Sequence, residues 1–457
     1  MPMAQNVSEG EELQNVHLDE ETKFEEEEEE EIPEYRTRWL YFIVFAWLAC
    51  SGRFMSLWLV GEGLSESEIG VIFAVGKALS PVFSAVISVV SDSLAKHSNA
   101  ARNHVCLACV LASTATFSLM SLTYPGTTRF WVVLVFNTLT EGLKGPVTPI
   151  LDAITVNGLR DRSQYGGERL YGAYSWAIVS LVLGGLMDYF GTRVMNFGAL
   201  LMAVAMVIAM AVQGPPPAPR QSTGVGRPEA GGSLLDLLKH YFSSVRVVAF
   251  FFYAITLAIG MVLVESLLFL FFRELNASNF VCGLSVVVTV VFEIPLFARS
   301  KAMLDVVGVH RLLIISGLCY SIRVIGYTFC PNGWYMLFFE PMHGVTFAAW
   351  QTASVEVMAS ITPPESAATG QAFLGIVRSV GYTAGVYGGG EVIARYGEKT
   401  CYRVAALIVG SGLAVNELGR LSSSGGYGKL PEKKFASGAA VEPSVVGVIT
   451  SESTAVD

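Results

Sequence analysis

The sequence predicts an all-α polytopic membrane protein whose twelve transmembrane helices form two six-helix bundles. Three observations support this. The chain of 457 residues is 52% hydrophobic but only 15% charged, against about 25% charged residues in a soluble domain. Its apolar residues gather in segments of about 20, the length that crosses roughly 30 Å of hydrocarbon. A Pro- and Gly-rich linker, 214–245, separates six such segments from six more.

The twelve predicted spans follow one another with short connections. They lie at 38–60, 69–90, 104–123, 130–154, 170–190 and 193–213 in the first bundle (38–213), and at 247–272, 279–299, 311–330, 334–360, 371–393 and 400–418 in the second (246–418). Residues 1–37 contain seven consecutive glutamates, and residues 419–457 are rich in Ser, Gly, Lys and Glu. Such polar segments cannot bury enough apolar surface to fold alone. Both tails are therefore predicted to be disordered.

The basic residues predict how the chain is oriented, because cytoplasmic loops carry an excess of Lys and Arg. With the N-terminus in the cytoplasm, nineteen of the thirty Lys and Arg fall in cytoplasmic segments, six fall outside and five fall within spans. We therefore expect both termini and the linker in the cytoplasm. The plasma membrane is the default location, and an organelle membrane is the alternative.

Eleven ionisable residues fall within the predicted spans, where a charge at the bilayer centre costs about 2.5–3.5 kcal/mol. The basic ones are Arg53, Lys77, Lys144, Arg323 and Arg378, and the acidic ones are Glu141, Asp152, Glu265, Glu293, Glu340 and Glu356. These groups must pair with one another or line a wet cavity, which favours a solute pathway over a passive anchor. Some have a simpler explanation: Glu141 and Lys144 are three residues apart and can neutralise each other, and Lys77 and Asp152 can reach an interface.

The segment FFEPMHG, residues 338–344, is the strongest candidate site. It places Glu340 and His343 on one helix face at mid-depth of the tenth span. Histidine titrates near neutral pH, and a desolvated carboxyl group holds its proton more tightly, so the pair can take up and release protons. Arg323 and Glu293 on neighbouring spans are the expected partners. A packing network that joins spans eight to ten is the alternative.

Prolines predict interruptions in two spans that occupy equivalent positions in the two bundles. In the tenth span, Pro341 removes a helix hydrogen bond and Gly344 relaxes the packing. In the fourth span, Pro146 and Pro149 predict a similar break. Paired interruptions at corresponding positions are a pointer to the central site of a transporter.

Other classes of function have no support in the sequence. The seven cysteines lie mostly in apolar stretches, which predicts core thiols rather than disulfides or metal ligands. No zinc pattern, P-loop, nucleophile elbow or dinucleotide fingerprint is present. We therefore expect no enzyme activity, no cofactor, no metal and no nucleic-acid partner. The expected partners are the lipid bilayer, a small-molecule solute and protons, with the chain as a monomer.

Several stretches resemble the major facilitator superfamily. GLSESEIGVIFAVGKALSPV (63–82) resembles the start of its second helix, and SVVSDSLAKHS (88–98) resembles the loop that follows, usually G-x-x-x-D-R-x-G-R. Three longer stretches, at 149–178, 290–297 and 339–375, are similar to the major-facilitator-associated branch, also called domain-containing-six-like. Its relatives include phenylpropionate permease-like, nucleoside:proton symporter-like and, more distantly, lactose permease-like proteins.

The resemblance implies roles for particular residues. Those implied at a cytoplasmic gate are Asp92, Lys96, Asp152, Tyr165 and Arg169, although Ser88, Ser93 and Ala95 depart from the loop motif. Those implied in the proton and substrate pathway of the second bundle are Glu293, Arg323, Glu340, His343 and Gly344. In lactose permease-like symporters a similar Arg, His and Glu cluster couples protons, with the opposite order of His and Glu.

The first span departs from the branch, which commonly has a proline where this chain has Arg53. Arg53 either presents a cation to an anionic solute or pairs with a carboxylate. Lys144, Glu141, Glu265 and Arg378 complete the expected pathway.

The predicted function is secondary active transport of a small organic solute by alternating access, through proton-coupled symport. The alternatives are a facilitative uniporter of the same fold and a non-transporting receptor or scaffold on a transporter fold.

Overall fold

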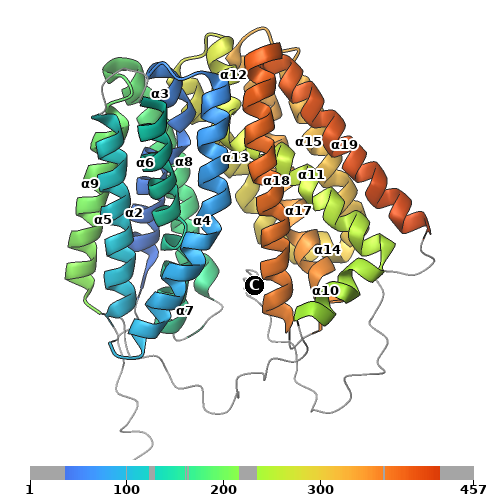
Figure 1. Cartoon of the computed structure of the whole chain (residues 1–457), viewed down its shortest axis with the longest axis horizontal. Coiled ribbons are helices and arrows are strands. Elements are labelled where there is room, and N and C mark those ends of the chain that lie inside the picture. The colour runs from blue at the N-terminus through green and yellow to red at the C-terminus, as the bar shows by residue number, and fades with distance from the viewer. Residues whose placement is uncertain are drawn as a thin grey trace, which may run out of the picture.

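The computed structural model describes residues 36–98, 100–122, 129–159, 161, 164–215, 234–363 and 366–422, and the regular elements in these ranges are helices (Figure 1). The acidic segment 1–35, the central part of the predicted linker at 216–233 and the segment 423–457 lie outside the described residues. The predicted disorder of the two tails therefore falls almost wholly outside them.

The helices of the first half are α2 (Arg38–Leu48), the π-helix η1 (Ala49–Arg53), α3 (Met55–Gly61), α4 (Glu66–Ala95), α5 (Ala101–Ser121), α6 (Arg129–Lys144), α7 (Val147–Gly158), α8 (Tyr165–Phe190) and α9 (Val194–Gln213). Those of the second half are α11 (Val245–Ser266), α12 (Leu268–Glu274), α13 (Asn279–Ala298), α14 (Ser300–Val307), α15 (Val309–Tyr327), α16 (Gly333–Met336), the 3-10 turn η3 (Leu337–Phe339), α17 (Pro341–Ile361), α18 (Ala367–Tyr396) and α19 (Glu398–Ser422). Between the halves lies α10 (Leu234–Ser243).

Nine candidate spans in the described part of the chain are long and apolar enough to cross a membrane. The predicted spans outside this set are the fourth, tenth and eleventh. The fourth is divided into α6 and α7, and the tenth passes from α16 through η3 into α17. The eleventh, α18, has 30 residues but is rich in glycine and polar side chains. With these three, the described helices make the twelve segments that the sequence predicts.

Four of the twelve segments are interrupted, and they are the first and fourth of each half. The first passes through η1 between α2 and α3, and the seventh breaks at Leu267 between α11 and α12. The breaks in the fourth and tenth segments fall at Pro146 and at the η3 turn before Pro341. The sequence predicts interruptions in the fourth and tenth segments only, because the first and seventh contain no proline.

The two halves meet through pairs of long helices. Helix α4 packs against α18, α8 packs against α13, and α3 contacts α12. Figure 1 shows the halves converging at the end that carries α3 and α12 and diverging toward the end that carries α7 and α10. At the converging end the backbones approach closely: a Cβ added to Gly70 would lie 2.9 Å from the carbonyl oxygen of Val386.

Helix α10 lies within the range that the sequence analysis assigns to the linker. Its Tyr241 is fully buried, and the hydroxyl group lies 2.6 Å from Oγ1 of Thr362. The tyrosine ring packs against Phe251 and Phe373 at centroid distances of 5.6 and 5.4 Å. The last part of the predicted linker is therefore fixed to the second half.

Candidate functional site

A buried ion pair lies at the interruption of the tenth segment. Arg323 on α15 donates from Nη2 to Oε2 of Glu340 at 2.7 Å, and each side chain is only 2% exposed. Tyr327 donates to Oε1 at 2.6 Å, and Thr289 on α13 donates to Oε2 at 3.0 Å. Arg323 also donates from Nε to the Tyr327 hydroxyl. The carboxylate thus accepts three hydrogen bonds from two neighbouring helices.

His343 shares the same arginine. Its Nδ1 lies 2.6 Å from Nη1 of Arg323. Because a guanidinium has donors but no acceptor, Nδ1 must accept this hydrogen bond, and the ring in this arrangement is neutral. The imidazole also stacks on Phe347, with an interplanar angle of 7°. A proton on Nδ1 would remove the bond and leave two cations in contact.

The backbone at the interruption explains how these groups come together. Glu340 is the residue before α17, and Pro341 occupies its first turn, where a proline needs no hydrogen-bond donor. A Cβ added to Gly344 would lie 2.8 Å from the backbone nitrogen of Glu293. Gly344 is therefore the point where α17 touches α13. Among the described residues, the ion pair of Arg323 is with Glu340 rather than with Glu293.

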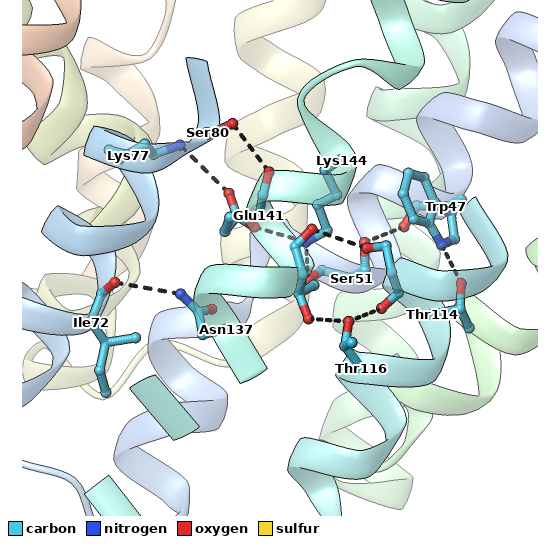
Figure 2. Close-up of polar contacts among 12 residues, drawn as sticks. Trp47, Ser51, Ile72, Lys77, Ser80, Thr114, Thr116, Asn137, Glu141 and Lys144 are labelled. Carbon is cyan, nitrogen blue, oxygen red and sulfur yellow. Dashed lines mark hydrogen bonds and ion pairs between the residues drawn. The ribbon is translucent and has the colours of Figure 1, made fainter. Parts of the chain in front are cut away.

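A second polar network occupies the first half, around Glu141 (Figure 2). Lys144 on α6 donates to Oε1 of Glu141 at 2.9 Å and to the carbonyl oxygen of Ser51 at 2.8 Å. On the other side, Nζ of Lys77 on α4 lies 4.0 Å from Oε2 of the same carboxylate. Ser51 belongs to η1, so Lys144 also holds the irregular turn of the first segment. One carboxylate is thus shared by two lysines.

The interruptions of the first and seventh segments touch each other across the halves. Arg53, the last residue of η1, donates from Nη1 to the backbone carbonyl of Glu265. Its guanidinium carbon lies 4.2 Å from the ring centroid of Phe269, and the rings of Phe54 and Phe269 are 4.9 Å apart. Arg53 therefore bonds a carbonyl and faces an aromatic ring, whereas the sequence left open a carboxylate or an anionic solute.

Glu265 lies within electrostatic range of cations from both halves. This carboxylate is exposed and interacts electrostatically with Lys77, Arg378, Arg53 and Arg323. Arg378 on α18 donates to Oε1 of Gln351 at 3.4 Å and to the hydroxyl of Tyr382 at 2.9 Å, both neutral partners. Lys77 and Arg53 come from the first half, and Arg378 and Arg323 come from the second. Glu265 consequently lies between the halves.

The residues implied at a gate form two separate groups. Asp152 on α7 accepts hydrogen bonds from Tyr41 at 2.6 Å and from Arg169 at 2.9 Å. The same Nη1 of Arg169 donates to the hydroxyl of Tyr165 at 2.6 Å. Asp92, on α4, instead accepts from Nη2 of Arg102 at 2.9 Å and is 66% exposed. Lys96 directly follows the last residue of α4.

A buried acidic residue beside this group is not predicted from the sequence. Glu168 on α8 is 2% exposed and accepts from the backbone nitrogens of Thr37 and Arg38 at 2.7 and 2.6 Å. Arg36 and Arg38 add side-chain bonds of 3.2 Å each. Glu168 therefore caps the first helix from another helix. The only sign of this residue in the sequence is a single acid within GGERLYG. Its contact with Thr37 and Arg38 arises from the packing of the helices.

A second unpredicted cap joins the halves at the converging end. Asp188, near the end of α8, accepts from the backbone nitrogen and Nδ2 of Asn279 at 2.8 and 2.9 Å. Its other oxygen accepts from the backbone nitrogen of Phe280 at 2.9 Å. These nitrogens belong to the first turn of α13 in the second half. On the opposite pair of helices, Ser67 of α4 donates to Glu391 of α18.

This arrangement of two helical halves around a polar centre is that of a membrane transporter, and comparison with known proteins agrees. Residues 35–404 match the MFS_1 like family. The chain is 22% identical over 334 residues to the uncharacterized transporter YwbF of Bacillus subtilis (strain 168), covering 72% of this chain and 79% of that protein. It is 24% identical over 299 residues to a maltose permease of Geobacillus stearothermophilus, covering 65% and 71%.

Solved structures share the fold at low sequence identity. Two crystal structures of the nucleoside transporter NupG superpose with TM-scores of 0.71 and 0.67 at 14% identity, covering 84% of this chain and 98% and 97% of those chains. A bacterial homolog of the human lysosomal transporter Spinster, in an inward-facing conformation, gives a TM-score of 0.63 at 12% identity, with 84% and 95% covered.

The chain belongs to the MFS_1 like family of major facilitator superfamily transporters. It is an integral multi-pass membrane protein and a transporter rather than an enzyme.

Proposed function

We propose that this transporter is a proton-coupled symporter of a small organic solute that works by alternating access. One observation carries the proposal: Arg323 is buried and holds two proton acceptors at once, the carboxylate of Glu340 and Nδ1 of His343. When either acceptor takes up a proton, Arg323 loses a hydrogen bond, so the position of its side chain depends on the protonation of both partners. Such intramembrane ionisable groups commonly mark proton relays.

The coupling follows from what a proton does at this cluster. Protonation of Glu340 or of Nδ1 in His343 removes an acceptor from Arg323, which must then find another partner. Glu340 adjoins the η3 turn, and the following turn of α17 touches α13 at Gly344. Helix α13 in turn packs against α8 of the other half. A change of hydrogen-bond partner at Arg323 therefore has a short route to the contact between the halves.

We further propose that both termini are cytoplasmic, that the chain acts as a monomer and that the plasma membrane is its location. In that orientation the diverging end faces the cytoplasm. The converging end faces the outside and is closed. Asp152, Tyr165 and Arg169, with Asp92 and Lys96, then belong to the cytoplasmic gate. The interruptions at Pro146, Pro149, Pro341 and Gly344 serve as the hinges of the transport cycle.

The test is a proton-flux assay on the purified protein in liposomes that contain a pH-sensitive dye. Maltose and uridine are the first solutes, because relatives and structural neighbours are named for maltose and nucleosides; a metabolite panel follows. With a transported solute, acidification of the lumen should follow solute entry. Glu340→Gln and His343→Ala should abolish proton entry while solute exchange continues, and unchanged coupling in both variants would exclude this mechanism.

A matched control tests whether the effect is local. Glu356 lies on the same helix, α17, but is exposed rather than buried, so Glu356→Gln should leave proton entry unchanged. The alternatives predict other results. Transport that is independent of pH would favour a uniporter, and loss of all function on deletion of residues 1–34, without loss of folding, would favour a receptor or scaffold.

A further inference from the structure

We infer that the transported solute carries an oxyanion, a carboxylate or a phosphate group, which Arg53, Arg378 and Lys77 bind between the two halves. The inference rests on the proposed transport function and adds the chemical class of the solute.

The basic residues within the predicted spans differ in whether they have a close anionic partner. There are five of them: Arg53, Lys77, Lys144, Arg323 and Arg378. Two carboxylates have close cationic partners: Glu340 pairs with Arg323, and Glu141 pairs with Lys144 at 2.9 Å. Lys77 is left at 4.0 Å from a carboxylate that already has a nearer lysine. Three cations therefore lack a close anion of their own.

Two of these cations, Arg53 and Arg378, have neutral hydrogen-bond partners. Arg53 bonds a backbone carbonyl and lies over the ring of Phe269. Arg378 bonds the amide of Gln351 and the phenol of Tyr382. All four partners are neutral, and neither guanidinium forms an ion pair with a carboxylate of the described ranges. A partly buried guanidinium is stabilised by a carboxylate or phosphate, which matches its paired donors.

The three cations also lie where the two halves meet. Arg53 belongs to the first half and donates to the backbone carbonyl of Glu265 in the second. Lys77 and Arg378 belong to α4 and α18, the helices that pack against each other across the halves. All three therefore belong to the contact between the halves, where Glu265 is exposed and the side chain of Lys77 is 35% exposed. An oxyanion bound there would contact both halves at once. A solute in an alternating-access transporter requires such a shared site.

Glu265 decides between an anionic solute and other classes. Arg53 donates to the backbone of this residue, so its carboxylate competes with an anion that binds the cations. Its removal should therefore strengthen the binding of an oxyanion. If the solute instead presented an amine or hydroxyl groups to Glu265, removal of the carboxylate would weaken binding.

The experiment measures ligand-induced thermal stabilisation of the purified full-length protein in detergent at constant ionic strength. The probes are benzoate, succinate and glycerol 3-phosphate as oxyanions, with maltose and uridine as neutral solutes. At least one oxyanion should raise the melting temperature. Comparing the shifts that the two carboxylates and the phosphate ester produce then shows whether the site prefers a carboxylate or a phosphate group. Stabilisation by neutral probes alone, or by none of the three oxyanions, would overturn the inference.

Variants then test the assigned residues with the oxyanion that binds. Arg378→Gln and Arg53→Gln should each weaken its binding about 10-fold or more, the effect of losing one charge-assisted hydrogen bond. Glu265→Gln should tighten binding several-fold. Arg395→Gln is the matched control, because Arg395 lies on the same helix as Arg378 but is 70% exposed and paired with Glu391. The melting temperature of each variant without ligand shows whether it is folded.

The outcomes separate this inference from the symport proposal. Equal weakening by Arg395→Gln and Arg378→Gln, or weakening by Glu265→Gln, would reject the oxyanion site. Oxyanion binding without proton entry in liposomes would leave this site intact and reject symport. Proton-coupled transport of a neutral solute alone would support symport and reject the oxyanion site.

Discussion

Replacing Glu340 with methionine should lower the free energy of unfolding by about 3–5 kcal/mol, because it leaves a buried charge without its partner. Arg323 is 2% exposed and would lose the carboxylate oxygen at 2.7 Å. Tyr327 and Thr289 would lose the acceptor that they share. The guanidinium would retain only the Tyr327 hydroxyl and Nδ1 of His343, both of them neutral.

Removing both charges of the pair should lower the free energy of unfolding by less than removing one. In the double variant Arg323→Met with Glu340→Met, no charge remains to be desolvated, and apolar side chains of similar volume fill the space. An exposed pair provides the contrast. Asp92 is 66% exposed and paired with Arg102, so Asp92→Asn should change stability by about 0–1 kcal/mol.

Titration with SDS in mixed micelles measures these free energies for the parent protein, the single variants Glu340→Met and Arg323→Met, the double variant and Asp92→Asn. The prediction is a large loss in each single variant and a smaller one in the double variant. A double variant less stable than both single variants would refute the reasoning, since it would mean that the ion pair itself stabilises the fold more than desolvation opposes it.

Three further predictions concern packing and the contact between the halves. Gly344→Ala should destabilise the protein and slow transport, because its Cβ would lie 2.8 Å from the backbone of Glu293. Gly375→Ala, with open space at its Cβ, should instead stabilise α18 by about 0.5–1 kcal/mol. SDS titration compares the stability of the two variants. Asp188→Ala should remove a cap worth about 1 kcal/mol and favour separation of the halves at the converging end. Spin labels on α8 and α13 should then be farther apart in distance measurements. An unchanged distance distribution would contradict this. Tyr327→Phe should lower stability by about 1–3 kcal/mol by leaving Glu340 short of a donor, and an unchanged melting temperature would contradict it.

The sequence predicts most of the helical plan because its signals are local. Apolar segments of sufficient length locate the spans, and Pro146 and Pro341 mark two of the interruptions. The interruptions of the first and seventh segments carry no proline and were missed. Their nearest signals are Gly52 beside Arg53 and the polar pair at 265–266 within an apolar run. Neither signal specifies a break, because glycine and isolated polar residues also occur in continuous helices.

The candidate site was predicted only in part, because pairing depends on which helices become neighbours. Charge alone singled out Arg323, Glu340 and His343, and the structure brings them within hydrogen-bonding distance. Tyr327 was overlooked, although it lies four residues after Arg323 and therefore on the same helix face. Glu168 could not be matched with the first helix from sequence, because their contact joins residues more than a hundred positions apart.

The closely packed glycines at the converging end limit how this protein can vary in evolution. Gly70 and Gly390 bring the backbones of α4 and α18 together, and a Cβ at Gly390 would lie 2.6 Å from the carbonyl oxygen of Glu66. No larger residue fits there without moving a whole helix. Lys77 and Arg378, on the same two helices, make only side-chain contacts. Among homologous transporters, we expect these glycines to be retained, while the cations change with the solute that each protein transports.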